Sequence, residues 1–436
     1  MWACRLLIVA RFCSFSGMGA DELVETRAEL DAFAQGVFAS LPRADQRSKG
    51  NLYVRGLMLD GRRKSMQPMG TRLGVDYQQL QQFVSSSPWK VEPVRRVLVH
   101  KAVQLIGPDA WVVDDTGFKK DGGSSPCVAR QYSGTLGKIG NCQIGVSIHA
   151  ATDQASCPLD WRLYVPEGWD DTCADTNEQA ETIKVRRAKA GLPDVQRHRT
   201  KWVMALEMID ELGVWGHRPP ALVGDAGYGE ITAFRGGLTE RQIPYMVAVK
   251  ASTTAYPADA VTVMHHSRRG PQPSTARYPD APSSLKELVV QAGRSSLHQV
   301  TWRRGTKSTT SNRLASMTSR FIALRIRPAN RDIPRADDGS LPVEWLLAEW
   351  PTGATAPTDY WLSTLPEDTP LKELVRLAKI RWRIEHDYRE LKTGLGLAHF
   401  EGRTWAGWHH HMTLVTAAHL FITTLRLTRP KADGAA

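Results

Sequence analysis

The sequence has few cysteines, no long apolar run and a deficit of acidic residues. Its six cysteines among 436 residues form no CxxC pair, which argues against a zinc ribbon, a redox pair and a disulfide framework. No segment reaches the ~18 apolar residues of a membrane span. Lys and Arg number 56 against 45 Asp and Glu, which leaves a net charge of +11. This surplus favours a polyanionic partner such as nucleic acid, because neutralised phosphates release counterions.

The rest of the composition, 42% hydrophobic and 23% charged, is that of an ordinary globular protein. Residues 2–15 (WACRLLIVARFCSF) superficially resemble a signal peptide, but Arg11 interrupts the apolar stretch and no A-x-A-like cleavage site follows. We therefore expect translation to begin at Met18 rather than at Met1, and we expect a cytoplasmic protein.

The pattern along the chain predicts an α/β fold in four segments. Strands and helices alternate between residues 111 and 250, which predicts a mixed sheet with helical crossovers. Residues 251–355 break that alternation and read as a β-rich insertion with a basic cluster formed by Arg303, Arg304, Lys307, Arg313 and Arg320. The predicted segments are an N-terminal helical domain (18–105), the first part of the core (106–250), the insertion (251–355) and the second part of the core (356–427).

The N-terminal helical domain contains a candidate helix-turn-helix. Residues 65–74 and 77–84 predict two short helices joined by a tight turn, with Asp76 as the N-cap of the second. Gln78 and Gln82 on that second helix suit base edges in a major groove. The basic residues that precede the unit suit phosphates; they are Arg62, Arg63 and Lys64. An ordinary helical hairpin remains the alternative interpretation.

Three carboxylates stand where a divalent metal site would need them. Asp114 and Asp225 each end a predicted strand, and Glu385 lies on a helix predicted to run from residue 369 to 394. At about 100° per residue, Arg381 and Lys392 share the helix face of Glu385. Oxygen ligands of this kind suit Mg²⁺ or Mn²⁺, and two such ions would activate a water or a 3′-hydroxyl and stabilise a leaving oxygen.

Three motifs carry a resemblance to a known family. They are residues 112–117 (VVDDTG), residues 223–229 (VGDAGYG), and the Arg–x3–Glu–x6–Lys pattern of Arg381, Glu385 and Lys392. The combination resembles the DDE transposases of bacterial insertion sequences, in the branch with an RNase-H-like core and a β-strand insertion before the last acidic residue.

The resemblance implies roles for these residues. Asp114, Asp225 and Glu385 would be the catalytic metal ligands, and Arg381 and Lys392 would contact the DNA. It also implies a nucleoid-associated homodimer on double-stranded DNA, with the terminal inverted repeats and the target as substrates.

Alternatives remain at several positions. Asp115 competes with Asp114 and Glu390 with Glu385, and Ala378 stands where the family usually has a Tyr. We expect residues 409–411 (HHH) to line a helix and Trp361 to be a core residue. The whole chain could instead be an inactive remnant that represses a related element, or a hydrolase with a carboxylate pair.

Overall fold

The structure is a computed structural model that describes residues 20–135, 137–264, 276–304 and 315–429. The expectations for residues 2–18, Lys307 and Arg313 lie outside these ranges. The chain divides into two compact units. The first unit takes the described residues up to Pro108, Asp114–Arg218 and those from Arg383 onward, and the second takes Asp109–Val113 and Pro219–Trp382.

The N-terminal part of the first unit is helical, as predicted for residues 20–105. Its helices are α2 (Ala20–Phe38), α3 (Ala44–Met58), α4 (Met66–Leu73), α5 (Tyr77–Ser85) and α6 (Val91–Ile106). The predicted tight turn is confirmed: Gly74 is left-handed at φ 70°, and the Asp76 carboxylate accepts the Gln78 amide at 2.9 Å. A Cβ on Gly70 would lie 2.9 Å from the Tyr77 Cβ, so glycine allows the close approach of the two helices.

A small antiparallel sheet forms the centre of the first unit. Its strands are β1 (Ala110–Lys119, from Asp114 onward), β2 (Ala129–Ser133), β3 (Lys138–Ala151) and β4 (Ser156–Leu163). β3 pairs with both β2 and β4. The remaining helices of the unit are α7 (Asn177–Ala190), α8 (Lys201–Val214), α13 (Trp382–Thr393) and α14 (Trp405–Thr428).

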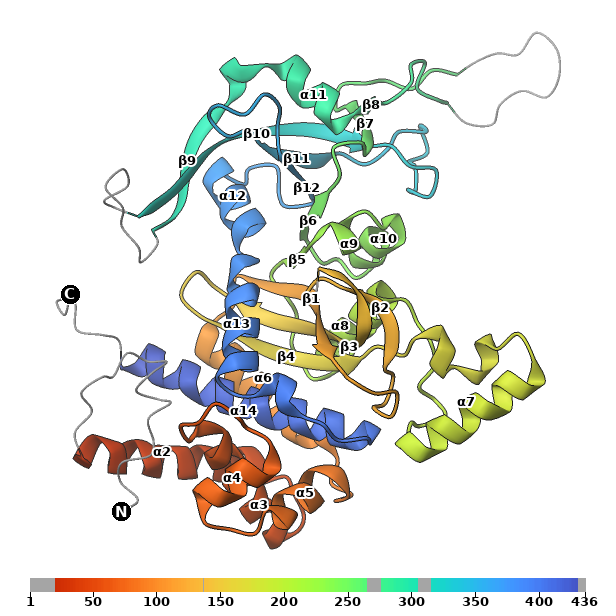
Figure 1. Cartoon of the computed structure of the whole chain (residues 1–436). Helices are drawn as coiled ribbons and strands as arrows, with labels where there is room; N and C mark the ends of the chain where they lie inside the picture. The colour runs from red at the N-terminus through yellow and green to blue at the C-terminus, as the bar shows by residue number, and fades with distance from the viewer. Residues whose placement is uncertain (1–19, 136, 265–275, 305–314, 430–436) are drawn as a thin grey trace. The chain divides into compact units, whose positions relative to one another are not determined.

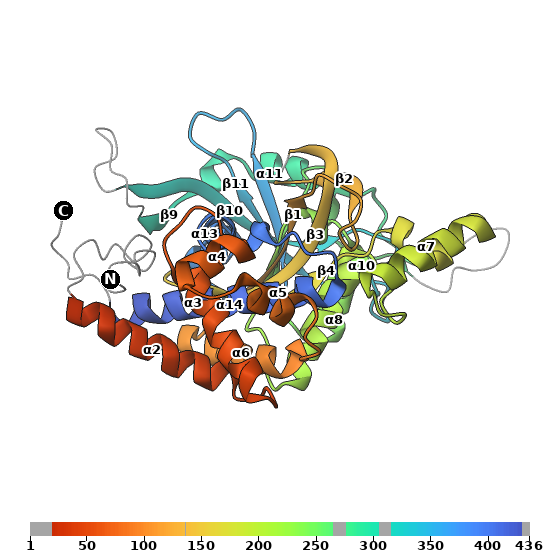
Figure 2. The ribbon, with the colours of Figure 1, turned by 60° about the horizontal axis from the view of Figure 1, so that its bottom comes forward.

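Helices cover both faces of this sheet (Figure 1). Arg162 on β4 bonds to Glu207 and Glu211 of α8, whereas Ser147 on β3 bonds to Tyr388 of α13. Side chains alternate between the faces of a strand, so α8 and α13 lie on opposite faces. α14 is buried along nearly its whole length and packs on β4 and on α3, α5 and α6, among which Figure 2 shows it.

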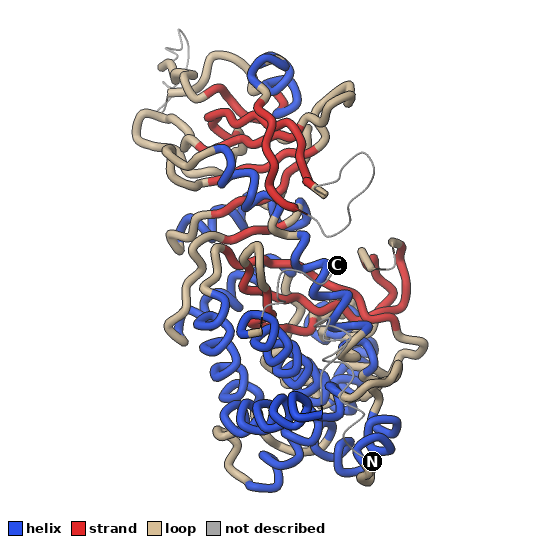
Figure 3. Tube along the Cα trace, turned by 90° about the vertical axis from the view of Figure 1, so that its left-hand side faces the viewer, coloured by secondary structure: helices blue, strands red, loops and turns tan. Residues whose placement is uncertain are grey.

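The second unit is rich in β-strands (Figure 3), and the segment 251–355, expected to be β-rich, contributes the strands β7 to β11 to it. The first residues of β1 pair in parallel with β5 (Leu222–Gly224), and β5 pairs in parallel with β6 (Tyr245–Val249). From β6 the sheet continues through antiparallel strands: β12 (Asp359–Ser363), β11 (Glu344–Glu349), β10 (Ser316–Pro328), β7 (Thr254–Pro257) and β8 (Ser283–Ser284), with β9 (His298–Arg304) also on β10. The helices are α9 (Ala226–Gly229), α10 (Thr232–Glu240), α11 (Leu285–Ala292) and α12 (Leu371–Lys379).

The prediction of one long helix from residue 369 to 394 is wrong. The structure has two helices, α12 and α13, separated at Ile380 and Arg381. The Ile380 amide bonds to the carbonyl of Leu377, three residues back, and the Ile380 side chain is fully buried. The Arg303 guanidinium lies 3.3 Å over the Trp382 ring just beyond the break. Neither glycine nor proline stands there, so the local sequence gives no sign of it.

Within the described ranges, no helix is long and apolar enough to cross a membrane.

Candidate metal and DNA site

The two motif aspartates follow directly on paired strand residues. Val113 pairs with Gly224 in the parallel β1–β5 ladder, and Asp114 and Asp225 are the next residues of the two strands. Asp225 caps α9, and its carboxylate accepts the Gly227 amide at 2.9 Å. Asp114 is 8% exposed, and one of its oxygens accepts the Asp115 amide at 2.7 Å. Asp225 therefore directly follows the end of β5, whereas Asp114 lies inside β1, at the residue after its pairing with β5 ends.

The adjacent carboxylates Asp114 and Asp115 face opposite sides of β1. Asp115 pairs with Lys201 of α8 at 2.9 Å. Thr116 lies on the other face, where its hydroxyl accepts a hydrogen bond from Lys392 of α13 at 2.6 Å. Asp114 shares the face of Thr116 because side chains alternate along a strand. This face, rather than the Asp115 face, is the one that α13 covers.

Lys392 is held beside the first aspartate motif. Its ammonium also donates to the Gly117 carbonyl at 2.9 Å and to the Thr135 hydroxyl at 3.2 Å. Burial lowers the pKa of Lys392 to about 8. Lys392, which the sequence pattern assigned to a phosphate contact, is thus a desolvated cation on the face of β1.

Glu385 is exposed on α13, seven residues before Lys392 and hence on nearly the same helix face. Its rival Glu390 is buried, with a bidentate pair to Arg426 and with His419 at 3.4 Å. Burial alone would raise the pKa of Glu390, but the hydrogen bond from Arg426 holds that pKa well below its usual value. Glu390 is therefore occupied inside the unit, whereas Glu385 lies at the surface.

Arg381 is not on the same helix as Glu385, contrary to the prediction. Arg381 lies in the break before α13. The helix face that Arg381 and Glu385 would share in one continuous helix therefore does not exist. Ala378, at the position of the family's tyrosine, is buried on α12.

The predicted DNA-contacting residues differ in exposure. Gln78 and Gln82 are exposed on α5, and Arg62 and Arg63 are exposed before α4. Lys64 corrects the prediction: it is 1% exposed, and its ammonium donates to the Leu59 carbonyl, so it does not reach a phosphate at the surface. Burial, together with nearby Arg72, lowers the pKa of Lys64 to about 7.

The histidine run lies on the helix α14, as predicted, and His410 and His411 are buried. His411 lies between the Tyr53 hydroxyl at 2.9 Å and the Gly396 carbonyl at 3.1 Å, and His410 contacts two backbone carbonyls. Trp361 is buried, also as predicted. Across the part of the chain that the structure describes, no three His, Cys, Asp or Glu side chains form a group that could hold a metal ion.

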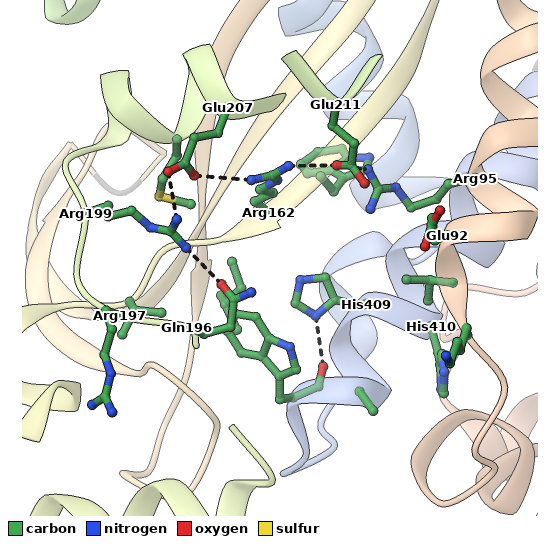
Figure 4. A pocket seen from close by; sticks show the side chains of 18 of the residues that line it. Glu92, Arg95, Arg162, Gln196, Arg197, Arg199, Glu207, Glu211, His409 and His410 are labelled. Atoms are coloured by element: carbon green, nitrogen blue, oxygen red, sulfur yellow. Dashed lines mark hydrogen bonds and ion pairs between the residues drawn. The ribbon is translucent and has the colours of Figure 1, made fainter. Parts of the chain in front are cut away.

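Sequence reasoning did not anticipate a polar pocket of about 410 Å³ in the first unit (Figure 4). Arginines and glutamates alternate along one wall, in the order Arg199, Glu207, Arg162, Glu211 and Arg95, with ion-pair distances of 2.7–3.3 Å. Because each charge has an opposite neighbour, the wall offers little net attraction to an anion. None of the predicted site residues lines this pocket.

Comparison with known proteins gives two findings. Residues 36–309 match the family model described as DDE superfamily endonuclease, a range that contains Asp114 and Asp225 and ends before Glu385. Over 201 residues the chain is 28% identical to a protein of Microchaete diplosiphon described as a probable transposase for insertion sequence element IS701. That alignment covers 45% of this chain and 47% of the relative, so the chain matches about half the length of this curated relative.

Proposed function

This chain belongs to the DDE superfamily of endonucleases, and we propose that it is the transposase of a bacterial insertion sequence. Its mixed, mostly antiparallel sheet is consistent with an RNase-H-like core. The observation that most supports the proposal is the β1–β5 register, in which Asp114 and Asp225 each directly follow the last paired residues, Val113 and Gly224. In this proposal the protein binds the terminal inverted repeats, cuts the element's ends and joins them to target DNA.

Asp114, Asp225 and Glu385 would hold the Mg²⁺ or Mn²⁺ ions of this reaction. The donor set fits, since all three side chains supply hard carboxylate oxygens. Asp115 fits less well because it lies on the other face of β1, beside Lys201 of α8, and Glu390 fits less well because it is buried beside Arg426. When bound, the ions would supply an activated water or hydroxyl and charge stabilisation at the leaving oxygen.

The chain's own cations would bind and orient the DNA backbone at the site. Lys392 is fixed by its contacts with Thr116 and Thr135, so it adds positive charge beside the Asp114 face without moving. Arg381 would contribute a guanidinium from outside α13. In the reaction, water attacks the scissile phosphate in line, and the freed 3′-hydroxyl then attacks the target.

Other parts of the chain would recognise the ends. Gln78 and Gln82 would read base edges from α5, while Arg62 and Arg63 would contact phosphates. Two ends must be brought together, so the active form would be a homodimer on DNA at the nucleoid.

A second candidate, a DNA-binding repressor without cutting activity, is favoured by one observation. Ala378 stands at the position where the family usually has a tyrosine, so the phenol hydroxyl is missing there. The presence of all three carboxylates favours the active enzyme instead.

Cutting of DNA that carries the element's own ends tests the proposal. We expect cutting with Mg²⁺ or Mn²⁺ and none with EDTA. Glu385→Gln should lower the cutting rate by about a hundredfold or more, with DNA binding and thermal stability unchanged.

Glu390→Gln is the matched control at the rival position. It should instead lower the free energy of unfolding by about 1–3 kcal/mol, because the partly exposed Arg426 would lose its charged partner. Binding without cutting under every metal would support the repressor, and no binding would contradict both candidates.

A further inference from the structure

We propose that Ser147, His149 and Asp387 form a buried clamp that sets the rotation of α13 about its own axis and thereby positions Glu385 and Lys392. The clamp itself is a property of the first unit. Its value for catalysis rests on the function proposed above.

The clamp is a continuous chain of hydrogen bonds between β3 and α13. Asp387 of α13 bonds to His149 Nδ1 at 3.0 Å, and His149 Nε2 lies 3.0 Å from the Ser147 hydroxyl. Ser147 in turn lies 2.8 Å from the hydroxyl of Tyr388, the next residue of α13. Ser156 on β4 donates to the other Asp387 oxygen at 2.7 Å. This series of hydrogen bonds therefore starts at one residue of α13, Asp387, and ends at the next, Tyr388.

Within this series of hydrogen bonds, every donor has an acceptor when His149 is neutral. Nδ1–H donates to the Asp387 carboxylate, Nε2 accepts from Ser147, and Ser147 accepts from Tyr388. Burial lowers the pKa of His149, although Asp387 opposes this effect, so the neutral form is kept. A fully satisfied buried network of this kind specifies one arrangement, because any other leaves a buried polar group unpaired.

Two attachment points on adjacent residues fix a helix more tightly than one. Asp387 and Tyr388 project about 100° apart around α13. Because both are bonded to β3, α13 cannot turn about its axis without breaking one of the two hydrogen bonds. Glu385 and Lys392 lie on the Tyr388 side, about 60° and 40° from it. A rotation of ~10° would move a carboxylate ~6 Å from the helix axis by ~1 Å. Misplacement of that size can cost about a hundredfold in rate.

The same three residues have the hydrogen-bond pattern of a Ser–His–Asp hydrolase triad. Ser147 and His149 are 0% exposed and Asp387 is 1% exposed, so no substrate reaches the serine oxygen. Because they are buried, these three residues can position α13 but cannot carry out nucleophilic attack on a substrate.

Tyr388→Phe removes the hydroxyl that closes the clamp and keeps the ring. Tyr53→Phe is the matched control, because it also removes a buried hydroxyl bonded to a neighbouring group, here His411 at 2.9 Å, without touching α13. We expect Tyr388→Phe to lower kcat for end cutting by about tenfold or more, with KM for DNA unchanged, and to raise the Mn²⁺ concentration needed for half-maximal cutting. Tyr53→Phe should lower the melting temperature without changing kcat or the Mn²⁺ requirement.

Hydrogen exchange of the backbone amides of residues 385–392 tests the clamp without activity. Tyr388→Phe and Ser147→Ala should each speed this exchange. The double variant should exchange no faster than Ser147→Ala alone, because Ser147→Ala already removes the bond to Tyr388 as well as the bond to His149. Equal exchange in Tyr388→Phe and Tyr53→Phe would overturn the clamp. Faster exchange with unchanged kcat would overturn its positioning role. If the wild type cuts no DNA, the proposed function and the positioning role both fail, and exchange alone still decides whether the clamp exists.

Discussion

Adjacent residues of the same type face different surroundings here. Asp114 and Asp115 are identical in chemistry, but β1 turns the first toward α13 and the second toward Lys201. The strand period alone predicts that they diverge. Which of them faces α13 depends on a helix more than 260 residues away in the sequence, so the local pattern could not decide it. The family resemblance of residues 112–117 favoured Asp114, the aspartate on the α13 face, and its role stays a prediction.

Exchanging the two aspartates for asparagine separates their roles. Asp114→Asn should lower end cutting by about a hundredfold or more, because a metal ligand is lost. Asp115→Asn breaks a half-exposed pair worth about 0–1 kcal/mol and should leave cutting within a few-fold of wild type. Single-turnover cutting rates of the two variants are the measurement. Equal losses in both would count against the assignment of Asp114.

Arg62, Arg63 and Lys64 illustrate what residue type cannot predict. All three were expected at phosphates, yet the Lys64 ammonium is buried against the Leu59 carbonyl. A lysine in a basic run reads as exposed from sequence, and only tertiary packing shows otherwise. Residues 409–411 were expected to line a helix because the run lacks an acidic or cysteine partner at helical spacing, but the burial of His410 and His411 was not predicted.

At the scale of elements, the α4–α5 unit was fully predictable and α13 only partly. Asp76 and Gly74 are local capping signals, and they fix the turn whatever surrounds it. The break before α13 has no such signal, since neither glycine nor proline stands at Ile380 or Arg381. Of α14, only the part around residues 409–411 was expected to be helical, because this helix is buried along nearly its whole length and so lacks the periodicity by which surface helices are found.

The α5 helix allows specific and general DNA binding to be separated. Alanine at both Gln78 and Gln82 should weaken binding to the element's ends by about tenfold or more and leave binding to unrelated DNA unchanged. Alanine at Arg62 and Arg63 should weaken both and lower the salt dependence by about one phosphate contact per residue. Filter binding or fluorescence anisotropy at several salt concentrations measures this. An equal effect of the glutamine changes on both DNAs would contradict base reading by α5.

At the scale of the whole molecule, buried histidines should make stability depend on pH. Burial lowers the pKa of His411 to about 4, against 6.5 for the ordinary side chain. Between these values the unfolded chain binds a proton that the folded chain does not, so stability is complete above about pH 6.5 and falls as the pH drops. Moving from pH 7.5 to pH 5 should cost about 2 kcal/mol through His411 alone.

Denaturant unfolding at the two pH values, with His411→Gln beside the wild type, measures this contribution. The free energy of unfolding should differ between the two pH values by about 2 kcal/mol less in the variant than in the wild type. An unchanged difference would show that His411 already carries a proton in the folded state.

Long-range pairing is what the sequence could not provide. The order of strands and helices between residues 106 and 250 follows from local pattern, but the pairing of Val113 with Gly224 joins residues 111 positions apart. The proposed catalytic assignment therefore depends on family resemblance, and it requires that three carboxylates distant in the sequence hold metal at one site.

Iron-directed backbone cleavage tests that claim most directly. The whole chain, bound to DNA carrying its element's ends, is loaded with Fe²⁺ and exposed to ascorbate and peroxide, and the breaks are mapped by mass spectrometry. The account predicts breaks near Asp114, Asp225 and Glu385 that excess Mg²⁺ suppresses together and that Glu385→Gln weakens together. Breaks near only one of the three, or breaks that Mg²⁺ does not suppress, would contradict a shared metal site.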